Sequence, residues 1–408
     1  MGYHVLNFKR LLYAPNIHQG GGRALLLPLL AELQDAEDVA FVLDDRLQLP
    51  DGVKLRGEVY RVKAALLSRL GIEWRLKRFV APQTRLLGMG NLPPLFAHQG
   101  EQLIFVQNRY LIDPLSLDGF SRRIRLRIWL ERWWLRSRAR YVNEFIVQTA
   151  TMRVLLQRAV GKDAVILPFA AVPEMEKVRE KTPQEFNYDF VYVATGEAHK
   201  NHEKLIEAWI ELAGRGIFPT LCLTLDAGRF PDLCAWINNA INKHSLKVFM
   251  IGECSHEKVM NLYENSRALI FPSLFESFGL PLIESVRAGL PVLASDLDYV
   301  KDVIQPSDSF DPLSPHAIAD AVCCFSFQPA SLNVNLLNAG EFLQQTLNRD
   351  EVTDHGISRP GLANLTADKR LQGAGDARHR PVMCTDVHEQ GDNTADSVPC
   401  DRLRDEGS

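Results

Sequence analysis

The chain lacks an excess of charge of either sign. Its 408 residues include 46 Lys and Arg against 50 Asp and Glu, so the net charge is -4. A balance of this kind produces no global field that would attract a polyanion. Nucleic acid is therefore not expected as a partner.

Cysteine is scarce as well. The seven cysteines form no Cys-x-x-Cys pair, and their number is odd. Neither a disulfide framework nor a zinc site is indicated, and no bound metal is expected. This usage fits a reducing cytoplasm.

Long apolar runs are absent too. The opening residues MGYHVLNFKRLLYAPN hold no apolar core of signal-peptide length, and no window reaches the length that a membrane-spanning helix needs. These absences predict a cytoplasmic protein whose contact with a membrane is peripheral, at the inner face of the plasma membrane.

The length and the apolar pattern predict two α/β domains. The chain exceeds one ordinary core. In residues 1–170, a helix at 24–33 and further helical patterns alternate with short apolar runs that predict strands at 11–15, 39–43, 103–106, 145–147 and 165–169. Alternation of this kind predicts a parallel sheet with helices on both faces.

A second alternation follows a charged, proline-containing linker at 171–187. Strands are predicted at 190–193, 220–224, 247–251 and 268–271, with helices at 202–213, 231–243 and 256–265. Residues 188–350 thus form a second doubly wound domain, and the two domains are expected to face a cleft. Ligands bind at the carboxyl ends of parallel strands, so one domain holds a donor and the other an acceptor.

The composition changes abruptly near the end of the chain. Residues 351–408 contain no Phe, Trp or Tyr, and Asp, Gly and Arg recur there without a period. We expect this tail to be disordered, and a foreign or frame-altered tail is one hypothesis for its origin. The segment 336–347 is the remaining candidate for a closing helix.

The segment FPSLFESFGLPLIESVRAGLPVLAS at 271–295 carries the strongest functional signal. Glu276 and Glu284 stand eight positions apart, and Pro281 suits the first turn of a helix that Gly289 ends. A strand, a glycine-bearing loop and a helix in this order direct free backbone N–H groups at one point, which suits a phosphate. Glu284 is expected in the first helical turn, within reach of the hydroxyls of a nucleotide, and Glu276 in the loop. Two carboxylates beside a diphosphate fit a nucleotide sugar.

This segment resembles the E-x7-E motif of retaining glycosyltransferases of the GT-B fold, in particular glycosyltransferase family 4. The resemblance covers roughly residues 10–325. It implies the GT-B architecture, two Rossmann-like domains facing a cleft. It also implies a closing helix that crosses back onto the first domain, for which residues 336–347 are the candidate. The resemblance further implies that Glu284 binds the nucleotide ribose and that Glu276 contacts the donor sugar. The intervening Ser277, Phe278, Gly279 and Leu280 belong to the same donor site.

The loop at 193–202 resembles the loop that follows the first strand of the second domain in this family. The resemblance assigns to Lys200 the neutralisation of the donor diphosphate. Many relatives also place an Arg in this loop, where this chain has Thr195 and His199. His199 is left to donate one hydrogen bond or to act as an imidazolium, without the fixed fork of an Arg.

Three further segments are candidates for the cleft. Gly20-Gly21-Gly22 does not satisfy the dinucleotide pattern, so an NAD site is not expected. The resemblance carries Gly21 and Gly22 over as a glycine loop beside the donor phosphate or the acceptor. Arg229 and Gly252 end two second-domain strands and are donor-side candidates, with a plain turn as the alternative for each.

Asn108 and Arg109 follow the predicted strand at 103–106 and are acceptor-side candidates, with structural hydrogen bonding as the alternative. No general base is evident. That is compatible with the front-face mechanism that the resemblance implies, in which the leaving phosphate oxygen takes the proton of the attacking hydroxyl.

Residues 121–140 hold eight arginines interleaved with Ile, Leu and Trp. Such a helix can lie on an anionic lipid surface. The alternative is a core helix with a solvated arginine face. A nucleic-acid stripe is a poorer third alternative, because no binding motif accompanies it.

Together these features predict a metal- and cofactor-independent retaining glycosyltransferase. It would move a sugar, with mannose as the first guess, from a GDP- or UDP-linked donor to a growing, lipid-linked surface polysaccharide or lipopolysaccharide O-antigen. One alternative is a GT-B nucleotide-sugar epimerase. The other is a non-catalytic subunit of a glycan-assembly complex.

Overall fold

The computed structural model describes residues 8–50, 52–115, 117, 120–170 and 186–349. The predicted linker at 171–187 lies outside these residues except for its last two positions. The predicted tail at 351–408 lies outside them entirely.

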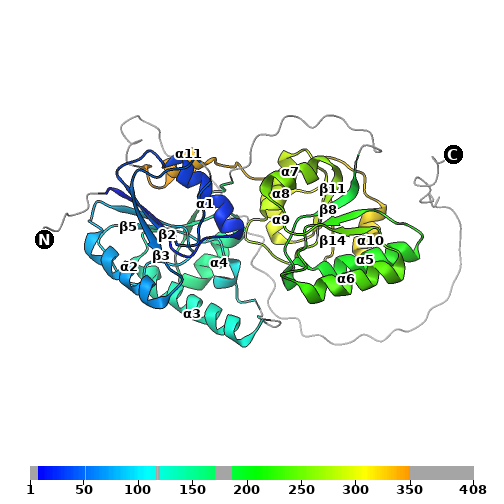
Figure 1. Cartoon of the computed structure of the whole chain (residues 1–408), viewed down its shortest axis with the longest axis horizontal. Coiled ribbons are helices and arrows are strands. Elements are labelled where there is room, and N and C mark those ends of the chain that lie inside the picture. The colour runs from blue at the N-terminus through cyan, green and yellow to red at the C-terminus, as the bar shows by residue number, and fades with distance from the viewer. Residues whose placement is uncertain (1–7, 51, 116, 118–119, 171–185, 350–408) are drawn as a thin grey trace, which may run out of the picture. The chain divides into compact units, whose positions relative to one another are not determined.

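The first domain contains a seven-stranded sheet (Figure 1). Every pairing in it is parallel, and the order is β3-β2-β1-β4-β5-β6-β7. The strands are β1 (Arg10–Ala14), β2 (Val39–Asp44), β3 (Glu58–Val62), β4 (Arg85–Gly88), β5 (Glu101–Phe105), β6 (Glu144–Val147) and β7 (Ala164–Ile166). The chain builds outward from β1 in both directions, so the order reverses between β1 and β4. Ligands of open α/β sheets bind beside such a reversal.

Helices cover both faces of this sheet. They are α1 (Gly20–Glu32), α2 (Leu66–Phe79), α3 (Arg122–Arg138) and α4 (Ala150–Val160). Along β1, Leu11 and Tyr13 enter the core formed with α2, α3 and α4, whereas Leu12 and Ala14 enter the core formed with α1. Successive side chains of a strand point to opposite faces, so a strand covered on both faces must be apolar throughout.

The second domain repeats the plan with six parallel strands in the order β10-β9-β8-β11-β12-β14. The strands are β8 (Tyr188–Tyr192), β9 (Leu221–Leu223), β10 (Val248–Met250), β11 (Ser266–Phe271), β12 (Val292–Ser295) and β14 (Asp308–Phe310). The order reverses between β8 and β11. The short strands β13 (Ile304–Gln305) and β15 (Ser331–Leu332) form a separate antiparallel pair.

Six helices flank the second sheet. They are α5 (His202–Gly214), α6 (Pro231–His244), α7 (His256–Glu264), α8 (Leu280–Arg287), α9 (Asp298–Val303) and α10 (Pro315–Cys323). Helices α5, α6 and α10 lie on one face, and α7, α8 and α9 lie on the other (Figure 1). The prediction of two doubly wound, Rossmann-like domains is confirmed.

Helix α11 (Ala339–Gln345) follows the second domain in sequence but packs into the core of the first. The ring of Phe342 stacks on Phe169 with centroids 4.8 Å apart and meets the edge of Phe105 at 5.5 Å. The predicted second domain runs to residue 350, whereas Ala339 to Leu347 supply core residues of the first domain. Apolar periodicity finds this helix but does not say which sheet it covers.

The burial of Phe342 leads to a stability prediction. The Phe342→Ala variant is expected to lose about 3–5 kcal/mol of unfolding free energy, because it removes a fully buried ring between two others. Urea denaturation followed by circular dichroism measures the loss. Phe218→Ala is the matched control, since Phe218 is 41% exposed. Equal losses in the two variants would contradict the docking of α11.

Candidate active site

A pocket of about 620 Å³ lies where both sheets reverse their strand order. In the first domain, the segments after β1, β4 and β5 contribute Gly21, Asn91 and Asn108. In the second domain, the loops after β8 and β11 contribute Lys200 and Glu276. The volume is that of a small-molecule site.

All the predicted site residues except Arg229 and Gly252 line this pocket. The lining set is Gly21, Gly22, Asn108, Arg109, Thr195, His199, Lys200, Glu276, Ser277, Phe278, Gly279, Leu280 and Glu284. The side chains at 200, 276 and 284, on which the nucleotide-sugar interpretation depends, therefore share one cavity.

The loop from 272 to 279 and helix α8 form one wall of the pocket. Gly279 precedes α8 with φ of +71°, a left-handed conformation that glycine adopts without strain, and a Cβ there would lie 3.1 Å from the side chain of Leu282. Pro281 occupies the first turn, as predicted. Pro281 has no N–H and Leu282 donates its own to the carbonyl of Gly279 at 2.9 Å, so the N–H of Leu280 is the first-turn donor that stands at the positive end of the α8 dipole. This position suits an anion.

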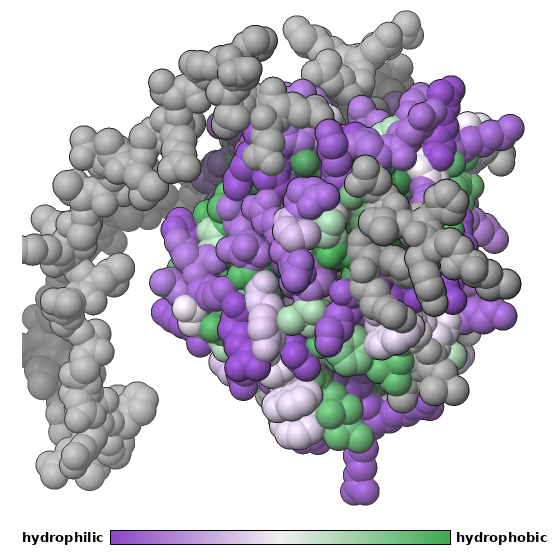
Figure 2. Space-filling view, turned by 90° about the vertical axis from the view of Figure 1, so that its left-hand side faces the viewer, coloured by the Kyte–Doolittle hydropathy of each residue, from purple (hydrophilic) through white to green (hydrophobic). Residues whose placement is uncertain are grey.

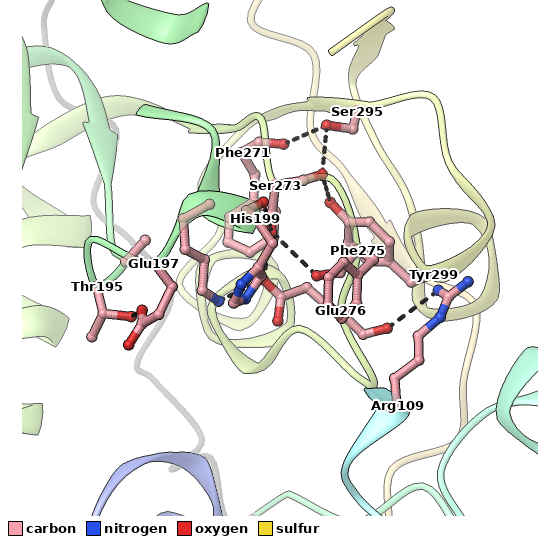
Figure 3. Close-up of polar contacts among 12 residues, drawn as sticks. Arg109, Thr195, Glu197, His199, Phe271, Ser273, Phe275, Glu276, Ser295 and Tyr299 are labelled. Carbon is pink, nitrogen blue, oxygen red and sulfur yellow. Dashed lines mark hydrogen bonds and ion pairs between the residues drawn. The ribbon is translucent and has the colours of Figure 1, made fainter. Parts of the chain in front are cut away.

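Lys200 and Glu276 form an ion pair at the centre of the pocket. Nζ of Lys200 lies 2.6 Å from Oε1 of Glu276, and the two side chains are only 16% and 14% exposed. The Ser273 hydroxyl donates to the same carboxylate oxygen at 2.7 Å (Figure 3). The pair neutralises its own charges, so an anionic ligand has to compete with Glu276 for the ammonium of Lys200.

A buried network fixes Ser273, and through it Glu276. The backbone carbonyl of Ser273 accepts hydrogen bonds from the Tyr299 hydroxyl at 2.7 Å and from the Ser295 hydroxyl at 3.0 Å (Figure 3). Leu274 donates its backbone N–H to the carbonyl of His199 at 2.7 Å. The loop that carries Glu276 is thus tied both to β12 and α9 and to the loop that carries Lys200.

Glu284 lies deeper in the pocket wall, on α8. The Tyr263 hydroxyl donates to its Oε2 at 3.2 Å, and Nδ1 of His256 lies 3.8 Å from its Oε1. Burial raises the pKa of this carboxyl, against the opposing influence of His256 and Tyr263. Glu284 is the fifth residue of α8, so it stands in the second helical turn and not in the first as predicted.

His199 is held by aromatic neighbours. Its Nδ1 lies 3.3 Å from the Tyr110 hydroxyl, and its ring centroid is 4.8 Å from that of Phe275. Burial, with Lys200 alongside, lowers the pKa of His199. The ring is therefore neutral near pH 7. Of the two roles considered for it, hydrogen bonding remains, and the cationic role is not supported.

Of the other donor-side candidates, Thr195 lines the pocket, whereas Arg229 and Gly252 do not. The Thr195 hydroxyl donates to Glu197 and lines the pocket. Arg229 approaches Glu197 at 3.9 Å and stacks on Phe230, outside the pocket lining. Gly252 has φ of +79° and is also outside the lining. For Arg229 and Gly252 the plain-turn alternative fits the geometry.

The acceptor-side candidates lie at the start of the 3₁₀ turn Arg109–Leu111. The Asn108 side chain accepts the backbone N–H of Tyr110 at 3.0 Å, which caps this turn. Arg109 pairs with Asp113 and, through two hydrogen bonds of 2.8 and 2.9 Å, with Asp298 of α9. Its guanidinium is therefore already shared by two carboxylates and ties the two pocket walls together.

The glycine candidates form the first turn of α1, rather than a loop before it. The helix begins at Gly20, and Gly21 faces the α8 wall, where a Cβ would lie 3.8 Å from Leu280. The N-termini of two helices, α1 and α8, thus border the pocket. The positive ends of their dipoles supply the fixed positive potential that the ion-paired Lys200 does not.

Several lining residues have no counterpart among the sequence predictions. The side chain of Asn91, with φ of +69°, accepts the backbone N–H groups of Gln107 and Asn108 at 2.6 and 2.9 Å. Tyr110, Phe275 and His256 also line the pocket. Phe275 lies inside the 271–295 segment, but Asn91, Tyr110 and His256 belong to no motif, so only the fold brings these three to the pocket.

Two absences apply to the described residues alone. None of their helices is both long enough and apolar enough to cross a membrane. No cluster of three or more His, Cys, Asp or Glu among them is arranged to hold a metal ion.

A pocket between two Rossmann-like sheets, each contributing its point of reversal, is the GT-B architecture. Solved structures share this fold. HepE from Anabaena, crystallised with UDP and glucose, has a TM-score of 0.55 over 77% of this chain and 88% of its own at 13% identity. Sucrose-phosphate synthase from Thermosynechococcus elongatus has a TM-score of 0.54 over the same shares at 17% identity.

The family model described as glycosyl transferases group 1 matches residues 174–325. The match falls mainly on the second domain. The chain is 34% identical over 171 residues to the serotype-specific mannosyltransferase WbdA of Escherichia coli, a match that covers 39% of this chain and 21% of the relative. It is 27% identical over 138 residues to the O-antigen chain mannosyltransferase B of Escherichia coli, covering 31% and 35%. The chain spans about a fifth of the length of WbdA.

Proposed function

We propose that this protein is a retaining glycosyltransferase that uses a nucleoside diphosphate sugar as donor. The observation that carries the proposal is the convergence of Lys200, Glu276 and Glu284 on one pocket below the N-terminus of α8. The diphosphate would sit at the N-termini of α8 and α1, because the first turn of α1 offers N–H groups without partners in the helix and both helix ends carry positive potential. The Glu284 carboxylate would accept hydrogen bonds from the ribose hydroxyls.

Lys200 would stabilise the diphosphate as it leaves. As the bond between the anomeric carbon and the phosphate oxygen breaks, negative charge grows on the diphosphate. The ammonium of Lys200 would then shift from Glu276 toward that charge, which frees Glu276 to accept hydrogen bonds from the sugar. The acceptor oxygen forms the new bond on the same face, and its proton passes to the leaving phosphate oxygen. These reaction steps need no metal and no cofactor besides the donor.

Mannose from GDP-mannose is our proposed donor, with a UDP-linked sugar as the alternative. The support is that the two relatives described above are mannosyltransferases, one serotype-specific and one named for the O-antigen chain. The proposed acceptor is a growing, lipid-linked surface glycan of the O-antigen type. Such an acceptor would place the protein at the inner face of the plasma membrane.

A donor screen tests the proposal. A nucleotide sugar that binds the native pocket stabilises the fold by mass action, by about 2.7 kcal/mol at a hundred times its Kd. We expect GDP-mannose to raise the melting temperature more than mannose or GMP does, because neither fragment spans both carboxylates and the N-terminus of α8.

The products of the same incubations separate the alternatives. Sugar transferred to an acceptor glycan supports the proposal. Conversion of the donor to its epimer without an acceptor would replace the transferase by an epimerase. Donor binding without any turnover would leave a glycan-assembly subunit, and no stabilisation by any nucleotide sugar would remove the nucleotide-sugar site altogether.

A further inference from the structure

Helix α3 carries an apolar stripe that faces solvent. Leu126, Trp129, Leu130 and Trp133 follow the i, i+3, i+4, i+7 spacing of one helical face, and they are 58%, 60%, 47% and 63% exposed. Exposed large hydrophobic residues are common singly, but a contiguous row on one helix marks an interaction site. Figure 2 shows the first-domain side of the protein, where green and white side chains interrupt a largely purple surface.

The core of the domain does not need this stripe. The opposite face of α3 supplies the buried residues, Ile128 and Leu135. That inner face is also held by polar contacts, since Trp134 donates its indole N–H to the carbonyl of Pro93 at 3.0 Å. The core-helix alternative for segment 121–140 therefore describes the inner face of α3 and leaves the solvent-exposed face without a role in the core.

Arginines border the stripe on both sides. At 100° per residue, Arg125 and Arg136 fall along one edge, and Arg123 and Arg127 fall along the other. All four are exposed. Among the described residues, Glu131 is the only carboxylate that pairs with any of them, with Arg127 at 2.9 Å. The surface is thus an apolar row between two cationic rows.

We propose that this face of α3 docks on an anionic lipid membrane. Trp and Leu side chains would enter the interface between headgroups and acyl chains, while the arginines contact lipid phosphates. A second copy of the chain fits less well, because two such faces would bring arginine rows together. A protein partner would need an acidic surface opposite the arginines, and this face of α3 favours such a partner less than an anionic membrane.

The docking face is joined directly to the pocket. On the inner side of α3, Arg132 donates to the backbone carbonyls of Tyr110 and Asp113 at 2.8 and 2.7 Å. The same turn carries Asn108 and Arg109 into the pocket. Docking through α3 would therefore hold the first-domain wall of the pocket close to the lipid surface, where a lipid-linked acceptor presents its glycan.

Vesicle co-sedimentation of the full chain tests the proposal without any turnover, so it can fail independently of the proposed transferase activity. The probes are vesicles of phosphatidylcholine alone and of phosphatidylcholine with phosphatidylglycerol. We expect binding to the anionic vesicles, weakened by added salt. Removal of each bordering arginine, as in Arg125→Gln, should weaken it about fivefold.

The double variant Trp129→Ser/Trp133→Ser should lose binding to the anionic vesicles while keeping the melting temperature of the parent protein. Trp236→Ser is the matched control, because Trp236 is an exposed Trp on α6 of the second domain. Equal binding to neutral and anionic vesicles, or equal loss in the control, would overturn the proposal. So would light scattering that shows a dimer dissociated by the double variant in the absence of lipid.

Discussion

The Lys200→Ala variant is expected to lower kcat for sugar transfer by about 10²- to 10³-fold, with a smaller change in KM. Removing one preorganised donor from a site where negative charge develops has an effect of this size. In the ground state Lys200 is paired with Glu276 at 2.6 Å, so its full interaction with the diphosphate is made only as the leaving group departs. Initial rates against donor concentration give kcat and KM separately.

Two further variants test whether the loss of kcat in Lys200→Ala comes from the charge that develops on the leaving diphosphate. Lys204→Ala removes another ammonium nearby in sequence, paired with Glu207 on α5, and should leave kcat unchanged. Lys200→Arg keeps the charge and should recover part of the rate. If Lys200→Ala raised KM and left kcat intact, the lysine would serve binding alone, and its assignment to the transition state would be wrong.

The fold was predictable where burial is two-sided and unpredictable where it is not. Strands β1 and β2 are apolar throughout because helices cover both faces, and such runs are visible in sequence. Strand β3, with sequence EVYRV, lies at the sheet edge with three of its five residues exposed, so it carries no apolar run. Strand β4, with sequence RLLG, holds only two large apolar residues in succession, which gives no strand signal of its own.

The candidate site is likewise predictable from the sequence only in part. Residues inside the Glu276 to Glu284 motif were found because their spacing is local and survives in the sequence. Arg229 lies beside Phe230 outside the pocket, because the end of a strand does not fix where a flexible side chain points. Tyr110 reaches His199 from the other domain, 89 positions away in sequence, and such a contact exists only after folding.

The Glu284→Ala variant is expected to weaken donor binding roughly ten- to hundredfold. A hydrogen bond to a charged group contributes about 1.5–3 kcal/mol, and the ribose hydroxyls would lose their acceptor. Calorimetric titration with the nucleoside diphosphate alone isolates this contact from the sugar. Glu257→Ala, on the exposed first turn of α7, is the control and should keep the parent Kd. A Kd unchanged in Glu284→Ala would remove Glu284 from the nucleotide site.

The pH dependence of the same titration examines the carboxylate itself. Burial raises the pKa of Glu284, so this carboxyl takes up its proton at a higher pH than an exposed glutamate does. The ionised form is the stronger acceptor, and donor affinity should therefore begin to fall, as the pH is lowered, above the ordinary glutamate range. The Glu284→Gln variant should lack this fall. His256 lies 3.8 Å from the carboxylate, so His256→Gln must retain the fall if Glu284 is its source.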